Sequence, residues 1–253
     1  RPTCVAGVPP DAYSQTGQLW GNPLYRWDVL SKTGFQWWIL RFKEVLKLVD
    51  IIRIDHFRGF EAYWEVPAVE KTAIKGRWVK SPGKELFTHV LKALGKLPII
   101  AEDLGVITPE VEALRDGFNF AGMKILQFAF DQNPENQYLP HNFIPNSVVY
   151  TGTHDNETTA GWFENLTPKL KKQVRDYLES AAGKIHHKLI RLAISSVSDI
   201  AVVPVQDIIG AGDHGRMNTP GKASGNWSYR FTLNELKTGD AKKIAGWCKI
   251  FGR

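Results

Sequence analysis

The chain has 253 residues, of which 43% are hydrophobic and 23% charged, an ordinary composition for a globular domain with a substantial core. Its net charge is +6, but the Lys and Arg residues are scattered, which argues against nucleic acid as a partner. No apolar run approaches the roughly 20 residues of a membrane helix, so we expect no membrane partner. The two cysteines, Cys4 and Cys248, make neither a metal motif nor a disulfide framework.

The first predicted elements lead to a short strand. Residues 1–34 are interrupted by Pro and Gly, which predicts loop structure. A helix is predicted over Phe35–Val49, because apolar side chains recur there at helical spacing. This helix continues directly into Asp50–Asp55, in which three isoleucines indicate a buried strand.

Two charged side chains occur in this strand. Arg53 and Asp55 are two residues apart and therefore point to the same side of a strand. A buried carboxylate beside a guanidinium keeps its charge, because the cation lowers the pKa of the carboxyl group. That environment suits a carboxylate nucleophile. In isolation, however, such a pair is more often a structural ion pair at a strand end.

The rest of the chain alternates between helical and strand patterns, after a mixed, Pro- and Gly-interrupted excursion over residues 60–83. Gly95 marks the end of one helix, and Thr108 and Pro109 mark the start of the next, as N-cap and first helical residue. In chain order, we predict the helix Lys84–Leu94, the strand Leu97–Ala101, the helix from Pro109, the strands Lys124–Phe130 and Ser147–Thr151, the helices around Leu170–Leu178 and His187–Val197, and the strand Ile200–Val205.

Strands that alternate with helices and form continuous apolar runs indicate a parallel sheet covered by helices. A (β/α)8 barrel carries its active site at the carboxyl ends of its strands. Five strands are recognisable where a closed barrel needs eight, so the predicted fold is α/β, the last five strands of a (β/α)8 TIM barrel. Polar pairs follow four of these strands: Asp55-His56, Glu102-Asp103, His154-Asp155 and Gln206-Asp207.

Three of these positions offer carboxyl groups for glycosidic bond chemistry: Asp55, Glu102 and Asp155. Cleavage or transfer of a glycosidic bond needs one carboxylate as nucleophile and a second carboxyl group as general acid, then base. The apolar residues before Glu102 favour a raised pKa, whereas Arg53 favours an ionised Asp55. Asp103 is the alternative general acid, although it lies on the opposite side of the strand.

Three long stretches occur in a characteristic order: DIIRIDHFRGF, IIAEDLGVIT and VVYTGTHDNET. In these stretches the chain closely resembles the 4-α-glucanotransferases known as amylomaltases or disproportionating enzymes, members of the α-amylase clan with a (β/α)8 barrel. The opening VAGVPPDAYSQTGQLWGNPLY is similar to the lid loop of that family and the segment after it, and PVQDIIGAGDHGRMNTPGKASGNW is similar to its last strand and following loop. One departure is Tyr229, which stands where the family usually has a second Trp.

The resemblance implies a role for each matched residue. Asp55 corresponds to the nucleophile, Glu102 to the general acid/base, and Asp155 to a third carboxylate that holds sugar hydroxyls. The other matched residues are expected to orient the nucleophile, hydrogen-bond the sugar or line the glucan groove: Arg53, His56, His154, Asp11, Gln18, Trp20 and Asn218.

The resemblance also implies an activity. We expect residues 1–253 to be the C-terminal portion of a single catalytic barrel that transfers α-1,4-glucan segments between maltooligosaccharides or starch chains by retaining double displacement. The expected partners are α-1,4-glucan donors and acceptors and the N-terminal remainder of the barrel, with no metal or organic cofactor, in a cytoplasm or a plant plastid. Two alternatives remain: an α-amylase-type hydrolase, and a non-catalytic glucan-binding fragment.

Overall fold

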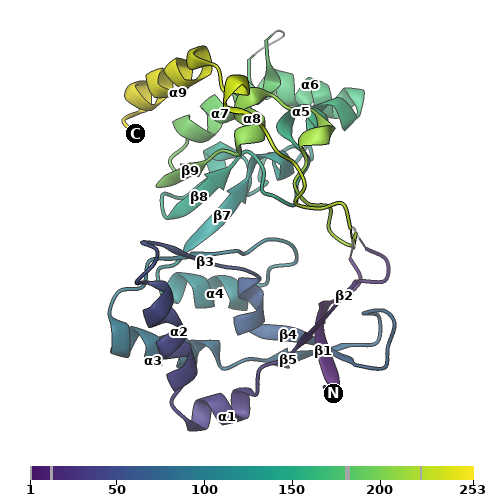
Figure 1. The fold of residues 1–253 in the computed structure, drawn as a ribbon, viewed down its shortest axis with the longest axis vertical. Coiled ribbons are helices and arrows are strands. Elements are labelled where there is room, and N and C mark those ends of the chain that lie inside the picture. The colour runs from purple at the N-terminus through teal and green to yellow at the C-terminus, as the bar shows by residue number, and fades with distance from the viewer. Residues whose placement is uncertain (1, 12–13, 180–182, 223) are drawn as a thin grey trace. The chain divides into compact units, whose positions relative to one another are not determined.

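The computed structural model describes residues 2–11, 14–179, 183–222 and 224–253, and its ribbon is drawn in Figure 1. The chain divides into two compact units, Arg1–Gly122 and Met123–Arg253. A five-stranded sheet, whose described pairings are parallel, has the strand order β3 (Ile52–Ile54), β6 (Ile99–Ala101), β7 (Ala121–Ile125), β8 (Ser147–Tyr150) and β9 (Ile200–Val202). Strand β7 begins in the first unit and ends in the second.

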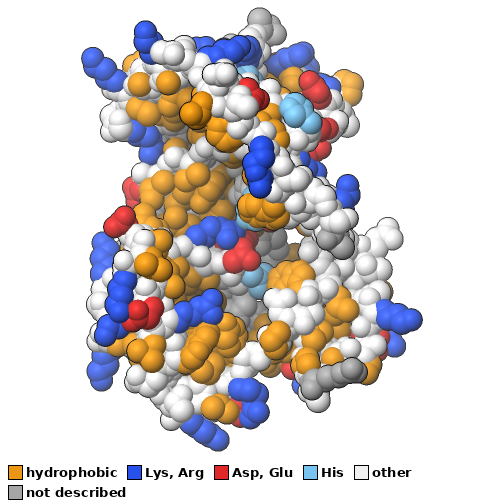
Figure 2. Space-filling view, viewed as in Figure 1, with side chains coloured by type: hydrophobic (Ala, Val, Ile, Leu, Met, Phe, Trp, Pro, Cys, Tyr) orange, Lys and Arg blue, Asp and Glu red, His pale blue; other side chains and the backbone are white. Residues whose placement is uncertain are grey.

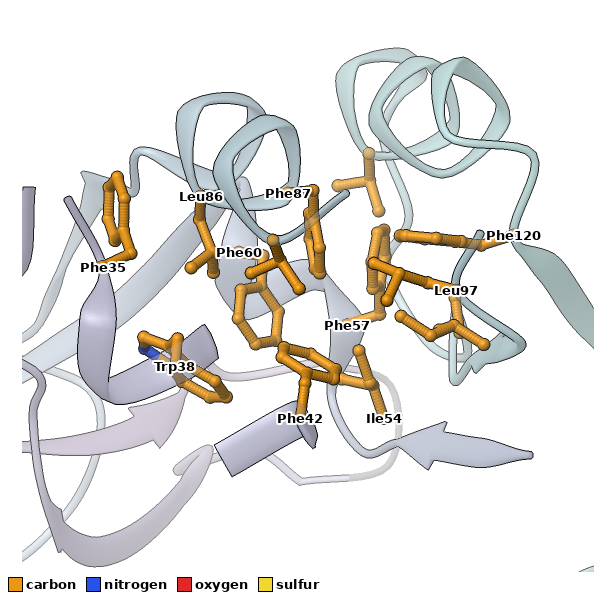
Figure 3. Packing of buried hydrophobic residues seen from close by; sticks show 14 residues of the cluster. Phe35, Trp38, Phe42, Ile54, Phe57, Phe60, Leu86, Phe87, Leu97 and Phe120 are labelled. Carbon is orange, nitrogen blue, oxygen red and sulfur yellow. The ribbon is translucent and has the colours of Figure 1, made fainter. Parts of the chain in front are cut away.

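The core of the first unit is aromatic. Helices α2 (Gln36–Val45) and α3 (Gly83–Leu94) contribute Trp38, Phe42 and Phe87 to it, and α4 (Pro109–Gly117) adds an aliphatic side chain. The rings of Phe57 and Phe87 are fully buried and stack with their centres 5.8 Å apart (Figure 3). Because Phe57 is only two residues beyond Asp55, this packing fixes the chain segment that carries the predicted nucleophile.

The prediction of loop structure for residues 1–34 is wrong. They form β1 (Cys4–Val8), β2 (Gln18–Pro23) and α1 (Trp27–Lys32), and the two strands join β4 (Ala62–Pro67) and β5 (Arg77–Lys80) in an antiparallel sheet of order β2-β1-β4-β5. In this sheet position 7 requires a glycine, because a Cβ there would lie 2.5 Å from the Gln18 carbonyl oxygen. The glycine thus allows the close approach of two strands, although in sequence it resembles a breaker.

Most other predicted elements are confirmed, with ends that shift by a few residues. The helix predicted over Phe35–Val49 is shorter, because Phe35 has a left-handed backbone and the helix stops at Val45. The strand predicted over Lys124–Phe130 is only partly correct. Strand β7 ends at Ile125, and a 3-10 turn follows over Leu126–Phe128, so the apolar run is buried in a turn rather than in a strand.

In the second unit, helices from the C-terminal part of the chain cover the strands. The core of this unit gathers buried side chains from β8, α5, α6 and α7. The helices are α5 (Thr159–Asn165), α6 (Pro168–Tyr177), α7 (Ile185–Ser195), α8 (Val205–Ile209) and α9 (Thr238–Phe251). Among the described residues, every helix is too short or too polar to cross a membrane.

Candidate active site

Two of the predicted carboxyl groups follow neighbouring strands of the first unit. Ile54 at the end of β3 pairs with Ala101 at the end of β6, and Asp55 and Glu102 are the next residues. The Glu102 N–H donates to the Ile54 carbonyl at 2.9 Å, and the Phe57 N–H donates to the Glu102 carbonyl at 3.0 Å. The two backbones are thereby tied together immediately beside both carboxyl groups.

Glu102 lies in a buried position that changes its acidity. Its carboxylate accepts the His56 N–H at 2.6 Å and the Leu104 N–H at 3.1 Å. Burial raises the pKa of Glu102 to about 7; the Asp55 charge adds to this, whereas the two N–H groups and Arg53 oppose it. A carboxyl group with this pKa can donate a proton and take one back near neutral pH.

Asp55 has a different environment. Its Oδ1 atom accepts a hydrogen bond from Arg53 Nη1 at 2.9 Å, so the two side chains lie on the same side of the chain as predicted. The expected burial is wrong, since 79% of the Asp55 side chain is exposed. Strand β3 ends at Ile54, which leaves Asp55 just beyond the sheet and open to a ligand. The carboxylate is therefore ion-paired and accessible.

His56 has a buried nitrogen without a partner. Nε2 is the atom concerned, and no described residue hydrogen-bonds to it. Burial lowers the pKa of His56 to about 4, so the ring is neutral at pH 7. The rings of Trp20, from β2, and His56 form a T-shaped pair with their centres 4.8 Å apart, and Trp20 Nε1 donates to Gln18 Oε1 at 3.2 Å. Of the three predicted lid-loop residues, Trp20 thus contacts His56 and Gln18 contacts Trp20.

The third lid-loop residue, Asp11, is bonded to Ser14. Its Oδ1 atom accepts the Ser14 N–H at 2.8 Å. Residues 12–13 of the quoted lid-loop stretch lie outside the described residues.

The second unit brings together the other three predicted site residues. Asn218 Nδ2 donates to Asp155 Oδ1 at 2.6 Å, and the Asn218 N–H donates to the His154 carbonyl at 3.0 Å. His154 Nε2 lies 3.4 Å from Asp155 Oδ2. The loop after β8 and the later loop around Asn218 therefore present one polar cluster.

Two residues of this cluster were not predicted individually from the sequence. Arg216 donates from Nη2 to the Asp155 carbonyl at 2.8 Å and from Nε to the Asn218 carbonyl at 3.0 Å. The Trp227 ring lies over His154 with the centres 5.2 Å apart. His154, Arg216 and Trp227 help to line a pocket of about 160 Å³. Both residues lie in the stretch GRMNTPGKASGNW, whose resemblance to the family could have identified them.

Asp103, the alternative general acid, has a structural environment. It is 5% exposed, and its Oδ2 atom forms an ion pair with Arg115. A Cβ on Gly122 would lie 2.6 Å from the same oxygen, so the neighbouring strand leaves no room for a ligand there. The geometry favours Glu102 over Asp103 as the proton donor.

Asp207, in the polar pair after the last predicted strand, is also structural. It is 2% exposed and accepts hydrogen bonds from Thr151 Oγ1, from the Thr159 N–H at 2.7 Å and from Thr159 Oγ1 at 2.7 Å. The carboxylate thereby joins the end of β8 to the first turn of α5.

Replacing Asp207 by Ala is expected to lower the free energy of unfolding by about 3–5 kcal/mol, because three donors lose their buried acceptor. Asp207→Asn keeps one acceptor oxygen and should cost less. The matched control is Asp176→Ala, which removes an exposed carboxylate paired with Lys172 and should change stability by less than about 0.5 kcal/mol. Urea unfolding of the chain together with the expected N-terminal remainder of the barrel measures all three, and equal losses in Asp207→Ala and Asp176→Ala would contradict the structural role.

The raised pKa of Glu102 predicts a pH dependence of stability. An ordinary Glu titrates near 4.5, so the folded protein binds this proton more tightly than the unfolded chain does. The resulting stabilisation is complete below pH 4.5 and is lost as the pH rises through about 7. We expect about 2 kcal/mol to be lost between pH 5 and pH 8.

The measurement is denaturant unfolding at both pH values, with Glu102→Gln as the comparison. Gln mimics the protonated carboxyl group, so the variant should match the parent near pH 5 and exceed its stability at pH 8. An identical slope in the two proteins would assign the pH dependence to other groups.

Among the described residues there is no group of three or more His, Cys, Asp or Glu side chains that could hold a metal ion.

Comparison with known proteins gives one consistent result. A family model described as 4-alpha-glucanotransferase matches residues 2–235. A 4-alpha-glucanotransferase of Thermus thermophilus is 54% identical over 93% of this chain and 49% of its own length, and one of Synechocystis is 56% identical over 98% and 50%. A relative from Solanum tuberosum, described as chloroplastic/amyloplastic, is 50% identical over the whole chain and 44% of its own length.

The fold shows the same relationship. The whole chain matches 51% of an amylomaltase chain from Streptococcus agalactiae in complex with acarbose, with a TM-score of 0.97 and 40% sequence identity. This match and the order of the parallel strands confirm the predicted fold class, five parallel strands that correspond to part of a barrel enzyme. The chain spans about half the length of the curated relatives it matches.

Proposed function

The chain belongs to the 4-alpha-glucanotransferase family, and we propose that it is the part of such an enzyme that carries the catalytic carboxyl groups Asp55, Glu102 and Asp155. The observation that carries this proposal is the contrast between two neighbouring groups. Asp55 is exposed and paired with Arg53, whereas burial raises the pKa of Glu102 to about 7. Carboxyl groups that differ in this way suit a nucleophile and a general acid/base.

In the proposed reaction, a carboxylate oxygen of Asp55 attacks the anomeric carbon of an α-1,4-glucan. The bond from that carbon to the departing glycosidic oxygen breaks, and Glu102 gives this oxygen its proton. The product of the first step is a glucosyl ester of Asp55. In the second step Glu102 takes the proton from the 4-hydroxyl of an acceptor glucan, whose oxygen displaces Asp55 and restores the α configuration.

Each unit by itself offers groups for the proposed sugar contacts. In the first unit, the neutral His56 ring and the Trp20 ring packed against it would contact the sugar. In the second unit, Asp155, His154 and Asn218 form the polar cluster that would hold further hydroxyl groups.

We also propose that an N-terminal half completes the barrel, since the chain spans about half the length of its relatives. The term full-length protein below means residues 1–253 together with this half. We place it in a cytoplasm, or in a plastid if the source is a plant, as the names of two plant relatives indicate for those proteins.

The test is incubation of the full-length protein with maltotriose. Transfer should produce glucose together with maltopentaose and longer products, with no net gain in reducing ends. A steady gain in reducing ends without longer products would identify a hydrolase instead. Glucan binding with no turnover would identify a non-catalytic binding protein.

A further inference from the structure

Arg58 is a buried cation close to the catalytic pair that has no assigned role. It lies in the 3-10 turn Phe57–Phe60, three residues after Asp55, and is only 8% exposed. Its Nη1 atom donates to the Val106 carbonyl at 2.8 Å, and its guanidinium lies over the Trp78 ring of β5, 3.8 Å from the ring centre. The side chain therefore connects β5 to the loop that follows Glu102.

That loop supplies one of the two hydrogen bonds to Glu102. The Leu104 N–H donates to Glu102 Oε1, and the loop has no regular secondary structure between β6 and α4. Leu104 lies between two anchored residues, because Arg115 pairs with the Asp103 side chain and Arg58 binds the Val106 carbonyl. The Val106 side chain itself is 63% exposed and provides little packing.

We propose that Arg58 is a positioning residue for the general acid/base: by holding the Val106 carbonyl, it keeps the Leu104 N–H on the Glu102 carboxylate. Trp78 completes the arrangement, because its ring lies against the guanidinium and restricts the movement of Arg58. An effect of Arg58 on the reaction rate rests on the proposed function. Its effect on the position of the Leu104 N–H does not.

Removing Arg58 should make Glu102 a weaker acid. An N–H bond to a carboxylate favours its ionised form, so a loosened Leu104 N–H raises the pKa of Glu102 further. The other groups that face Glu102 stay in place in such a variant. They are Arg53, Asp55 and His56 at the end of β3; the Asp103–Arg115 ion pair lies next along the chain, on the opposite side of the strand.

The experiment compares Arg58→Met with Arg77→Met in the full-length protein. Arg77 is exposed, pairs with Glu65 and belongs to the same strand as Trp78, so its loss controls for removing an arginine from this region. Because the general acid must be protonated, the alkaline limb of kcat/KM reports the pKa of Glu102. We expect this limb to move up by about 0.5–1 pH unit in Arg58→Met and to stay in place in Arg77→Met.

Two more variants separate the possible causes. Arg58→Lys keeps the charge but loses the planar fork, so it should recover only part of the shift. Trp78→Leu leaves the arginine in place and should shift the limb in the same direction by a smaller amount, which also provides a test if Arg58→Met does not fold. Full recovery by Lys would overturn the proposal, because charge alone would then explain the effect.

A direct titration of Glu102 by carbon-13 NMR separates this inference from the proposed function, since it needs no turnover. An inactive parent protein with the expected Glu102 shift in Arg58→Met would contradict the proposed function and support the positioning role. An active parent with an unchanged Glu102 titration in Arg58→Met would overturn the positioning role.

Discussion

Replacing Asp55 by Ala is expected to lower kcat of the full-length protein by about 10⁴- to 10⁶-fold, because loss of a nucleophile removes the covalent route altogether. The matched control is Asp176→Ala, which removes an exposed aspartate of α6 and should leave activity unchanged. Binding of maltooligosaccharides by Asp55→Ala should persist, since Trp20 and His56 remain. The measurements are initial rates on maltotriose and a binding titration.

Glu102→Gln should reduce the rate on maltotriose by at least about 10³-fold but leave the nucleophile intact. A substrate with a good leaving group, such as α-glucosyl fluoride, needs no proton donor for the first step. It should therefore glucosylate Asp55 in Glu102→Gln, and the ester should persist because the base for the second step is missing. Mass spectrometry of peptides locates the sugar. A glucosyl group on any other residue would contradict the assignment of Asp55.

The apolar approach to Glu102 and the Arg53–Asp55 pair could be predicted from the sequence, because each depends on residues that are neighbours in the chain. The exposure of Asp55 could not, since it depends on where β3 ends. The Arg58–Val106 contact could not be predicted from the sequence either, because it joins residues 48 positions apart. Local periodicity carries no information on such contacts.

The opening strands illustrate the same limit. Strand β1 pairs with β4, about 60 residues later in the chain. Its short, Gly-containing sequence has no periodicity strong enough to identify the strand from the sequence alone. Asp207 followed a predicted strand just as Asp55 and Glu102 did. Only its three buried hydrogen bonds separate it from the catalytic candidates.

Residues 1–253 produced alone are expected to be marginally stable and inactive on maltotriose. Strands β3 and β9 end the order of the parallel sheet in the described residues, and unpaired edges promote aggregation. Hydrophobic side chains lie at the surface shown in Figure 2. The apolar side chains exposed on α2 and before β3 include Trp37 at 46%, Leu40 at 55%, Leu48 at 85% and Ile51 at 44%.

An N-terminal half supplied in trans should cover the β3 edge and this exposed apolar surface and restore turnover, because all three proposed catalytic carboxyl groups are present in this chain. The measurement is size-exclusion chromatography of the chain with and without the corresponding half of the Thermus thermophilus relative, followed by analysis of maltotriose products. Leu40→Glu should weaken association, because it places a charge on the apolar surface of α2. The matched control Lys43→Glu changes an exposed charged residue of the same helix. A soluble monomer of residues 1–253 with substantial transfer activity would show that five strands suffice, and the proposed completion of the barrel would then be wrong.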